Sequence, residues 1–313
     1  MGSKTRSARN TSYDERKYMK KINILKYASV FVSCMCMVAM LSSCSALNIG
    51  TVYTPPLKES TVADNLLIEA GVLKVGLDTT NNSPYAGNIN SEIIGMDADI
   101  AALIASDLGL KVEFVEIDNA SKLPIGEDKV DVVIGVNKDV VANSNYWYSD
   151  PYINNGACLF AADAKARVPQ KGDGSKFSAQ TSSASAWKVS SYFGSDSLLS
   201  TSSLNESFEM LAAGEAQYVA SDIIVGSYAV HSNEYTAYPI AMLEAPTSLT
   251  LAADIKNTEL CIALSDVITK IKSNGFLDLI VNKWLGAAPD PSAYPVIAVA
   301  DTRTSTPEEI IPL

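Results

Sequence analysis

The sequence predicts an α/β protein built from mainly parallel β-sheets that are flanked by helices. Short segments rich in valine and isoleucine alternate with segments whose apolar residues recur at helical spacing. This alternation starts at Thr61 and runs through two successive units. The chain has 313 residues, of which 47% are apolar and 19% charged, so it is long and apolar enough to form about two globular units with hydrophobic cores. In this fold class a ligand is expected at the carboxyl ends of the strands.

In the first unit, glycines and short apolar runs mark the ends of the predicted elements. A short helix is predicted to close at Gly71, and the apolar spacing of residues 97–108 predicts a helix that stops at Gly109. The predicted strands are residues 72–77, 111–116 and 130–135.

The second unit and the C-terminal region follow the same pattern. Ser203 and Glu206 form a capping box that predicts a helix to about residue 213, and a further helix is predicted from Asp222. The predicted strands are residues 177–180, 217–221 and 249–252, and the last two helices are about 258–273 and 275–285. Residues 286–313 contain five prolines, so this tail is expected to be irregular or to lie along the surface.

The N-terminal region has the pattern typical of an export signal. Lys20, Lys21 and Lys26 precede an uncharged, mostly apolar run from Ala28 to Leu41, which is long enough for a signal peptide but short for a membrane span. The run ends in Leu41-Ser42-Ser43-Cys44, which resembles the bacterial lipobox. This resemblance implies a signal peptide over residues 1–43, lipid attached to Cys44, and a tether over residues 44–60.

Three alternatives for the N-terminus stay open. An ordinary secretory signal with an incidental cysteine, or an uncleaved anchor helix, would fit the same residues. Met19 also begins a more typical signal and could be the true start of the chain. In the lipidated form, the protein is expected on the extracytoplasmic face of the cell membrane, in a periplasm or at the cell surface.

Charge and composition exclude several classes of function. The chain has 24 lysine and arginine residues against 35 acids, and without residues 1–43 the balance is 16 against 33, which argues against a nucleic-acid partner. His231 is the single histidine, so any site that needs two imidazoles is excluded, and no metal or other cofactor is predicted. Cys158 and Cys261 would remain after signal removal, either as two buried thiols or as one disulfide.

Several short motifs occur along the chain in a fixed order. They are Gly71-Val72-Leu73-Lys74-Val75-Gly76, Gly95-Met96-Asp97-Ala98-Asp99-Ile100, Lys129-Val130-Asp131-Val132-Val133-Ile134, Tyr148-Ser149-Asp150-Pro151-Tyr152, and near the end Ser273-Asn274-Gly275 with Lys283-Trp284-Leu285-Gly286. In this order they resemble motifs of the family-3 bacterial extracellular solute-binding proteins, which are receptors for polar amino-acid uptake by ATP-driven importers. Each motif alone is weak, but together they span about residues 66–287 in the correct order.

The resemblance implies a two-lobed fold of the type 2 periplasmic-binding-protein class. Each lobe would be a mainly parallel sheet flanked by helices, and two hinge strands would join the lobes. Lobe 1 would comprise residues 61–155 and 252–287, lobe 2 residues 156–251, and residues 288–313 a proline-rich tail. A ligand at the hinge favours the closed state because only there do both lobes contact it.

The implied function is that of a receptor without catalytic activity. The expected partners are a small polar ligand, the permease of an importer, and the membrane through the lipid anchor, and the chain is expected to be a monomer. Two rivals on the same fold are an enzyme similar to cyclohexadienyl dehydratases and a surface sensor or interaction protein that has lost transport.

The sequence lacks the arginine with which similar family members bind a ligand carboxylate. Family members that bind α-amino acids use an arginine that pairs with the ligand carboxylate, and the ungapped position here is Ala142. Asp139 stands where the family has a threonine, and Lys138 beside it either offers a point charge or pairs with Asp139 in a solvated loop. An α-amino-acid ligand is therefore in doubt, and a cationic or neutral polar ligand is favoured.

Other positions match the family's ligand-binding pattern, and each also has a purely structural interpretation. Asp222 matches the acid that receives a ligand ammonium, or it caps a helix. Asp78 matches an acid of cationic-amino-acid binders, or it is a turn residue. Tyr85 matches an aromatic residue at the pocket mouth, or it packs its loop. Asn137 matches a polar pocket position.

The last matching segment is a predicted helix start. Thr181, Ser182 and Ser183 stand where the family has a glycine followed by serine or threonine, and backbone N–H groups there would meet an anionic end of the ligand. Because Ser182 replaces the glycine, a close backbone approach is less certain. Tyr146 and Trp147 would add an aromatic wall or, as favoured for aromatic residues before a crossover strand, belong to the core.

Overall fold

The computed structural model describes residues 58–80, 83–117, 123–125, 129–141 and 143–297, and the fold is reported for these residues. The signal segment, Cys44 and most of the tether lie outside the described residues, and so does Ala142. Within the described part of the chain, no helix combines the length and the apolar character needed to cross a bilayer.

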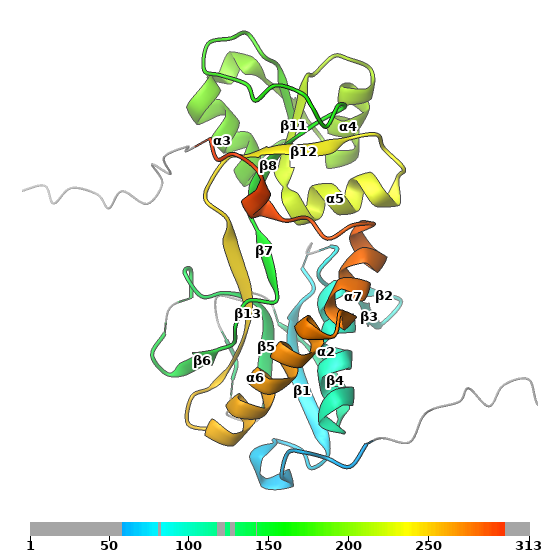
Figure 1. The fold of residues 1–313 in the computed structure, drawn as a ribbon, viewed down its shortest axis with the longest axis vertical. Helices are drawn as coiled ribbons and strands as arrows, with labels where there is room; N and C mark the ends of the chain where they lie inside the picture. The colour runs from blue at the N-terminus through cyan, green and yellow to red at the C-terminus, as the bar shows by residue number, and fades with distance from the viewer. Residues whose placement is uncertain (1–57, 81–82, 118–122, 126–128, 142, 298–313) are drawn as a thin grey trace, which may run out of the picture. The chain divides into compact units, whose positions relative to one another are not determined.

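The first sheet has six strands in the order β4-β1-β5-β13-β6, and β7 pairs with β13 (Figure 1). β1 is parallel to both of its neighbours, whereas β13 is antiparallel to β5, β6 and β7. The bounds are β1 Val72–Asp78, β4 Lys111–Ile117, β5 Val132–Asn137, β6 Tyr146–Tyr148, β7 Ile153–Asn155 and β13 Thr247–Asp254. A separate hairpin comprises β2 Gly87–Ile89 and β3 Glu92–Ile94.

Three helices accompany the first sheet, and their ends follow from local sequence. They are α2 Met96–Leu108, α6 Thr258–Ser273 and α7 Phe276–Leu285. α2 ends at Gly109, whose φ of 75° is left-handed and whose added Cβ would lie 2.5 Å from the backbone oxygen of Lys58. α6 begins after Asn257, whose side chain accepts a hydrogen bond from the Leu260 N–H.

The second sheet has five strands in the order β10-β9-β11-β8-β12. β9 is parallel to β10 and β11, and β8 is antiparallel to β11 and β12. The strands are β8 Ala157–Ala161, β9 Phe177–Gln180, β10 Leu198–Thr201, β11 Tyr218–Asp222 and β12 Tyr238–Met242, and the helices are α3 Ala184–Phe193, α4 Leu204–Ala212 and α5 Ile223–Ser232. Each sheet carries helices, which confirms the predicted α/β class, but the sheets combine parallel and antiparallel pairs and are not mainly parallel as predicted.

Two antiparallel strands connect the sheets. β7 pairs with β13, and a single residue, Gly156, separates β7 from β8 of the second sheet. β13 follows β12 and already pairs with β7 at Thr247, five residues before the predicted lobe boundary at residue 252. The assignment of exact lobe boundaries remains a prediction.

The C-terminal segment, residues 286–297, forms a further connection that the sequence did not predict. It leads from α7 back to the second sheet, where the Met242 N–H donates to the Pro295 oxygen at 2.9 Å and the Ile297 N–H donates to the Met242 oxygen at 2.7 Å. Val296 forms a parallel bridge with Met242 of β12. The Ile297 side chain is 9% exposed and lies in the core of the second sheet.

Two local expectations change. The short helix expected to close at Gly71 is wrong: the structure has one 3₁₀ turn, η1 Asp64–Leu66, and then a bridge between Glu69 and Val72. Five residues are too few to extend that turn while also reversing into β1. Cys158 and Cys261 are both buried free thiols, so the disulfide alternative is wrong.

Candidate functional site

Four of the predicted site positions lie at the carboxyl ends of parallel strands. Asp78 and Asn137 end β1 and β5, which are parallel neighbours in the first sheet. Asp222 ends β11 and Thr181 follows β9, which are parallel neighbours in the second sheet. Each pair therefore lies at one edge of its sheet, where α/β proteins bind their ligands.

Asp222 accepts hydrogen bonds on both of its carboxylate oxygens. One carboxylate oxygen, Oδ1, accepts from the N–H groups of Ile224 and Val225 at 3.0 and 3.1 Å, so Asp222 is the N-cap of α5. The other, Oδ2, accepts from Asn155 Nδ2 at 2.5 Å. Burial raises the pKa of Asp222 to about 6, and the nearby Glu244 carboxylate acts in the same direction. The predicted capping role is confirmed.

Tyr85 and Asn155 carry two buried polar atoms that lack a partner. Among the described residues, these atoms, Tyr85 Oη and Asn155 Oδ1, are the buried side-chain nitrogen or oxygen atoms without a hydrogen bond. Burial raises the pKa of Tyr85 well above its usual value, and the carboxylates of Asp222 and Asp97 raise it further, so the phenol stays protonated. Asn155, the last residue of β7, was not predicted as a site residue.

Asp97 adds a second buried acid close to Tyr85. It is 2% exposed, and one of its oxygens accepts from the Tyr152 hydroxyl at 2.8 Å. Burial raises the pKa of Asp97 to about 7, although the Tyr152 hydrogen bond opposes this change. We refer to Tyr85, Asp97 and Tyr152, which are buried, together with the half-buried Asn155 and Asp222, as the buried polar cluster.

The buried polar cluster contains no lysine or arginine, and no salt bridge to Asp97 or Asp222 is found in the described part of the chain. Lys188 of α3, a buried cation, is paired with Glu244 at 2.7 Å. Glu244 also accepts from the Ala157 N–H at 2.9 Å, so its charge is balanced locally. The two cluster acids are thus acceptor-rich and without a cationic partner among the described residues.

The remaining predicted residues of the first sheet form turns. Asp78 accepts from the Thr80 N–H at 3.0 Å, as expected of a turn residue. Asn137 accepts from the Asp139 N–H at 3.0 Å, and Asp139 itself is exposed. Lys138 is also exposed, and no ion pair between Lys138 and Asp139 is found among the described residues. The structure joins none of these to the buried polar cluster by a hydrogen bond between described residues.

In the segment before α3, most polar groups of Thr181 and Ser183 already form hydrogen bonds within the protein. Thr181 donates both its N–H and its hydroxyl to the Thr201 oxygen, at 2.9 and 2.8 Å. The Ser183 side chain accepts from the Ala186 N–H at 3.0 Å, so it caps α3. The Thr181 and Ser183 N–H groups are therefore not free for an anionic ligand, since the latter donates to the Gln180 oxygen.

Ser182 has a backbone conformation that favours glycine. Its φ of 64° lies in the left-handed region, which glycine adopts without strain and serine adopts at a cost. The backbone geometry expected of a glycine is therefore kept, with a side chain added. Tyr146 and Trp147 pack against the hydrophobic cores and Tyr146 donates to the Leu123 oxygen at 3.1 Å, which supports the core interpretation.

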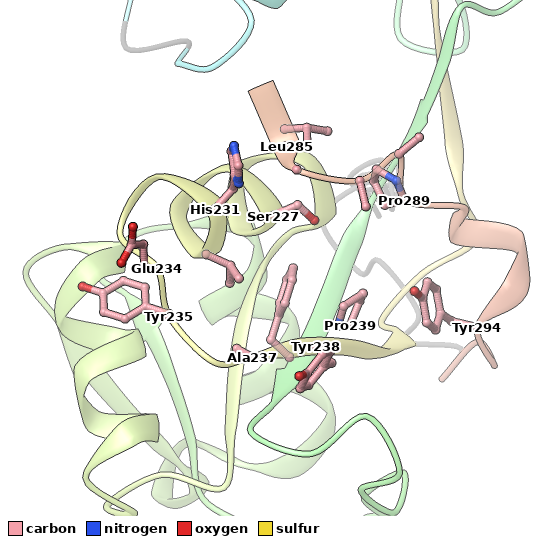
Figure 2. Close-up of a pocket in the computed structure, with 15 residues that line it drawn as sticks. Ser227, His231, Glu234, Tyr235, Ala237, Tyr238, Pro239, Leu285, Pro289 and Tyr294 are labelled. Atoms are coloured by element: carbon pink, nitrogen blue, oxygen red, sulfur yellow. The ribbon is translucent and has the colours of Figure 1, made fainter. Parts of the chain in front are cut away.

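His231 lies elsewhere, in a cavity of about 460 Å³ between α5 and the chain after α7 (Figure 2). Ser227 and Glu234 line the same cavity, but no hydrogen bond joins either residue to His231 among the described residues. An added Cβ at Gly286 would lie 2.6 Å from the imidazole Nδ1, so the ring packs against this glycine. The cavity contains none of the predicted ligand-binding residues and shows no hydrogen-bonded Ser-His-acid arrangement.

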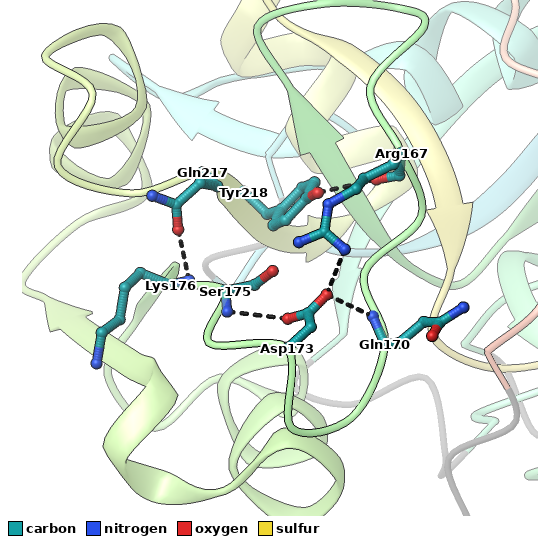
Figure 3. Close-up of polar contacts among 7 residues, drawn as sticks. All are labelled: Arg167, Gln170, Asp173, Ser175, Lys176, Gln217 and Tyr218. Atoms are coloured by element: carbon teal, nitrogen blue, oxygen red, sulfur yellow. Dashed lines mark hydrogen bonds and ion pairs between the residues drawn. The ribbon is translucent and has the colours of Figure 1, made fainter.

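A third acid-centred arrangement is structural. Asp173 accepts hydrogen bonds from Arg167, from the Gln170 N–H and from the Ser175 N–H at 2.8, 2.9 and 2.9 Å (Figure 3). The Gln170 backbone hydrogen bond and the other contacts hold the pKa of Asp173 well below its usual value. Tyr218 of β11 donates to the Arg167 oxygen at 2.8 Å, so this loop is fixed to the second sheet.

Comparison with known proteins identifies the family. The model of the bacterial extracellular solute-binding proteins, family 3, matches residues 73–287, which is more than half of the chain. The chain belongs to this family. Membership fits an extracytoplasmic location, and it confirms the resemblance that the sequence motifs indicate. A search of curated proteins found no match to this solute-binding protein.

Solved structures of low sequence identity share its fold. An ancestral cationic amino acid solute-binding protein is 23% identical with a TM-score of 0.57, and the match covers 69% of this chain and 96% of that one. The L-cystine solute receptor of Neisseria gonorrhoeae, in an unliganded open conformation, is 21% identical with a TM-score of 0.57, covering 70% and 94%.

A third solved structure gives the same result. A polar amino acid ABC uptake transporter substrate-binding protein from Streptococcus thermophilus is 18% identical with a TM-score of 0.61, and the match covers 72% of this chain and 89% of that one. These likenesses confirm the type 2 periplasmic-binding-protein-like fold for this solute-binding protein. The named relatives are binding proteins rather than enzymes.

Proposed function

We propose that this solute-binding protein is a receptor, without catalytic activity, for a small polar ligand that carries a cationic amine. It would deliver the ligand to the permease of an ABC importer as a monomer. Family membership supports the receptor role, because two of the similar structures are named as a solute receptor and an uptake-transporter protein. The class of ligand is carried by one observation, the half-buried carboxylate of Asp222 without a basic partner among the described residues.

Electrostatics favours a cation at this carboxylate. A buried acid whose pKa is raised to about 6 is ionised at neutral pH at a cost, and an ammonium group in contact with it would offset that cost. The family's arginine position is Ala142, so a ligand whose main anchor is a carboxylate lacks its usual partner. Asp78, Asn137, Asp139, Thr181, Ser182 and Ser183 are proposed to line the rest of the site.

A thermal-shift panel tests this function. Purified protein would be heated with lysine, arginine, ornithine, putrescine, agmatine, glutamine and a dipeptide mixture, and the melting temperature compared with that of the protein alone. We expect cationic amines to raise the melting temperature and Asp222→Asn to remove the shift. Asp266→Asn, on an exposed position of α6, is the matched control.

The outcomes separate the rival functions. If none of the compounds shifts the melting temperature, the receptor role is contradicted and a sensor or interaction protein is favoured. Turnover of prephenate or arogenate would favour a dehydratase-like enzyme, whereas the proposal expects none.

The proposed lipid anchor needs its own test. The precursor would be expressed in a bacterial host supplied with an alkyne-tagged palmitate, and the label followed on the mature protein. We expect labelling that Cys44→Ser abolishes, with the protein in the membrane fraction. Labelling that survives this substitution, or none in the unaltered protein, would contradict the anchor.

A further inference from the structure

The cavity beside His231 is a second candidate binding site, separate from the carboxyl ends of the strands (Figure 2). Its volume of about 460 Å³ lies within the range of small-molecule sites, about 300–1,000 Å³. α5 and the start of β12 form one wall, and the end of α7 with the C-terminal segment forms the other. We infer that this cavity binds a protonated arylalkylamine, that is, an aromatic ring joined to an ammonium group.

Part of the cavity wall lies beyond the region that the family model matches. The match ends at residue 287, whereas Ala288, Pro289 and Tyr294 also line the cavity. These residues are held in place because the C-terminal segment docks on β12, where the Met242 N–H donates to the Pro295 oxygen at 2.9 Å. The cavity therefore depends on a segment outside the family's matched region.

Aromatic side chains supply part of the cavity surface. Phe160 is buried, Tyr235 and Tyr294 are half-buried, and Tyr238 is 44% exposed. The Tyr235 ring also stacks on Phe208 with the ring centroids 5.4 Å apart, which fixes its orientation. An aromatic ligand is favoured at such a surface, because ring pairs gain stability beyond the area that they bury.

The polar side chains of the cavity are not engaged by the rest of the described chain. They are the hydroxyls of Ser227, Tyr235, Tyr238 and Tyr294, the imidazole of His231 and the carboxylate of Glu234. None of these side chains makes a hydrogen bond to another described residue. By contrast, the side chains of Thr181 and Ser183 already form hydrogen bonds within the protein. The cavity therefore offers donors and acceptors that a ligand can use.

Glu234 determines the charge that the cavity favours. It is the one acid among the described lining residues, none of which is a lysine or arginine, and no salt bridge to Glu234 is found in the described part of the chain. The backbone beside it is fixed, since the Tyr235 N–H donates to the Val230 oxygen at 3.0 Å. A carboxylate and the faces of tyrosine rings both attract a cation. An aromatic anion is repelled by the same carboxylate.

Three probes with one ring system and different charges test the inference. They are tryptamine, 3-methylindole and indole-3-propionate, which are cationic, neutral and anionic at neutral pH. Each would be titrated into the full mature chain and followed by NMR of the backbone amides. We expect the signals of residues at the end of α5 and in the C-terminal segment to shift. Tryptamine should bind about fivefold more tightly than 3-methylindole, and indole-3-propionate should bind most weakly.

Two substitutions with matched controls locate the site. Glu234→Gln should reduce the affinity for tryptamine about fivefold, to that for 3-methylindole, whereas Glu215→Gln, on another exposed acid, should have no effect. Ala287→Trp introduces a large side chain at an exposed residue that lines the cavity, and it should remove binding of every probe. Ala293→Trp, exposed in the same segment but outside the cavity lining, should not.

Substitution of Asp222 separates this inference from the proposed function. Asp222→Asn should leave the binding of tryptamine unchanged, because Asp222 does not line the cavity. If Asp222→Asn removes that binding and Glu234→Gln does not change it, tryptamine binds at Asp222, which would overturn this inference and support the proposed function. Equal affinities for the three probes would contradict the preference for a cation. Absence of binding by all three would contradict the site itself.

Discussion

Replacement of Asp222 by asparagine is expected to stabilise the protein at neutral pH while it removes amine binding. The pKa of this acid rises from 3.8 in the unfolded chain to about 6 in the folded protein, chiefly because of burial. The unfolded chain therefore ionises first, and the stability contributed by this group falls as the pH rises from about 4 to 6. Above that range the folded protein carries a cost of about 3 kcal/mol for the buried charge.

Asparagine removes this cost and keeps the local contacts. It is as good an N-cap as aspartate, so the hydrogen bonds to Ile224 and Val225 can persist. Its amide nitrogen would face Asn155 Nδ2, and a flip of the Asn155 amide turns Oδ1 toward it to accept that hydrogen bond. At pH 7.5 the gain of about 3 kcal/mol corresponds to a melting temperature higher by roughly 6–10 °C for a domain of this size.

Calorimetry at two pH values is the appropriate assay. The difference between Asp222→Asn and the unaltered protein should be large at pH 7.5 and small at pH 4, where the acid is protonated in the folded protein and about half protonated in the unfolded chain. Asp266→Asn, an exposed change of the same kind, should show no such dependence on pH. An equal difference at both pH values, or a loss of stability at pH 7.5, would refute the assignment of a buried ionised acid.

Three further changes have expected outcomes. Asp173→Asn should lower stability by about 1–3 kcal/mol at pH 7, because it weakens charge-assisted hydrogen bonds of the loop, and the loss should shrink as the pH falls toward the depressed pKa of Asp173 in urea titrations. Gly286→Ala should lower the melting temperature by several degrees, since its φ is 74° and its Cβ would contact His231 at 2.6 Å, whereas Gly87→Ala, with open space, should not. Ile297→Ala should cost about 2 kcal/mol in chemical unfolding if the C-terminal segment is docked, and no cost would contradict its place in the core.

The sequence predicted regular elements well where local chemistry determines them. The helix over residues 258–273 was predicted with its observed bounds, and the helix ending at Gly109 began one residue earlier than expected. Both have clear apolar spacing and a recognisable cap or terminal glycine. The helix predicted to close at Gly71 failed because that glycine serves a turn into β1 rather than a helix end.

The site was only partly accessible from sequence because its contacts are long-range. Asp222 could be found from its position at the end of a strand, but its partner Asn155 lies 67 residues earlier and in a stretch without a distinctive pattern. The burial of Asp97 could not be predicted from the sequence either, since an acid in the first turn of a helix is normally solvated. Tyr152, whose hydroxyl binds that acid, appeared only as part of a crossover motif.

The C-terminal segment has a consequence for how the protein behaves when it is shortened. The family match ends at residue 287, but the chain beyond it, as far as residue 297, pairs with β12 at the edge of the second sheet. An unpaired strand edge is a template for association with another chain. A protein ended at the family boundary would expose this edge and the apolar surface under Ile297, and it would be prone to aggregate. Residues 295–297 thus protect the edge of the sheet that carries Asp222.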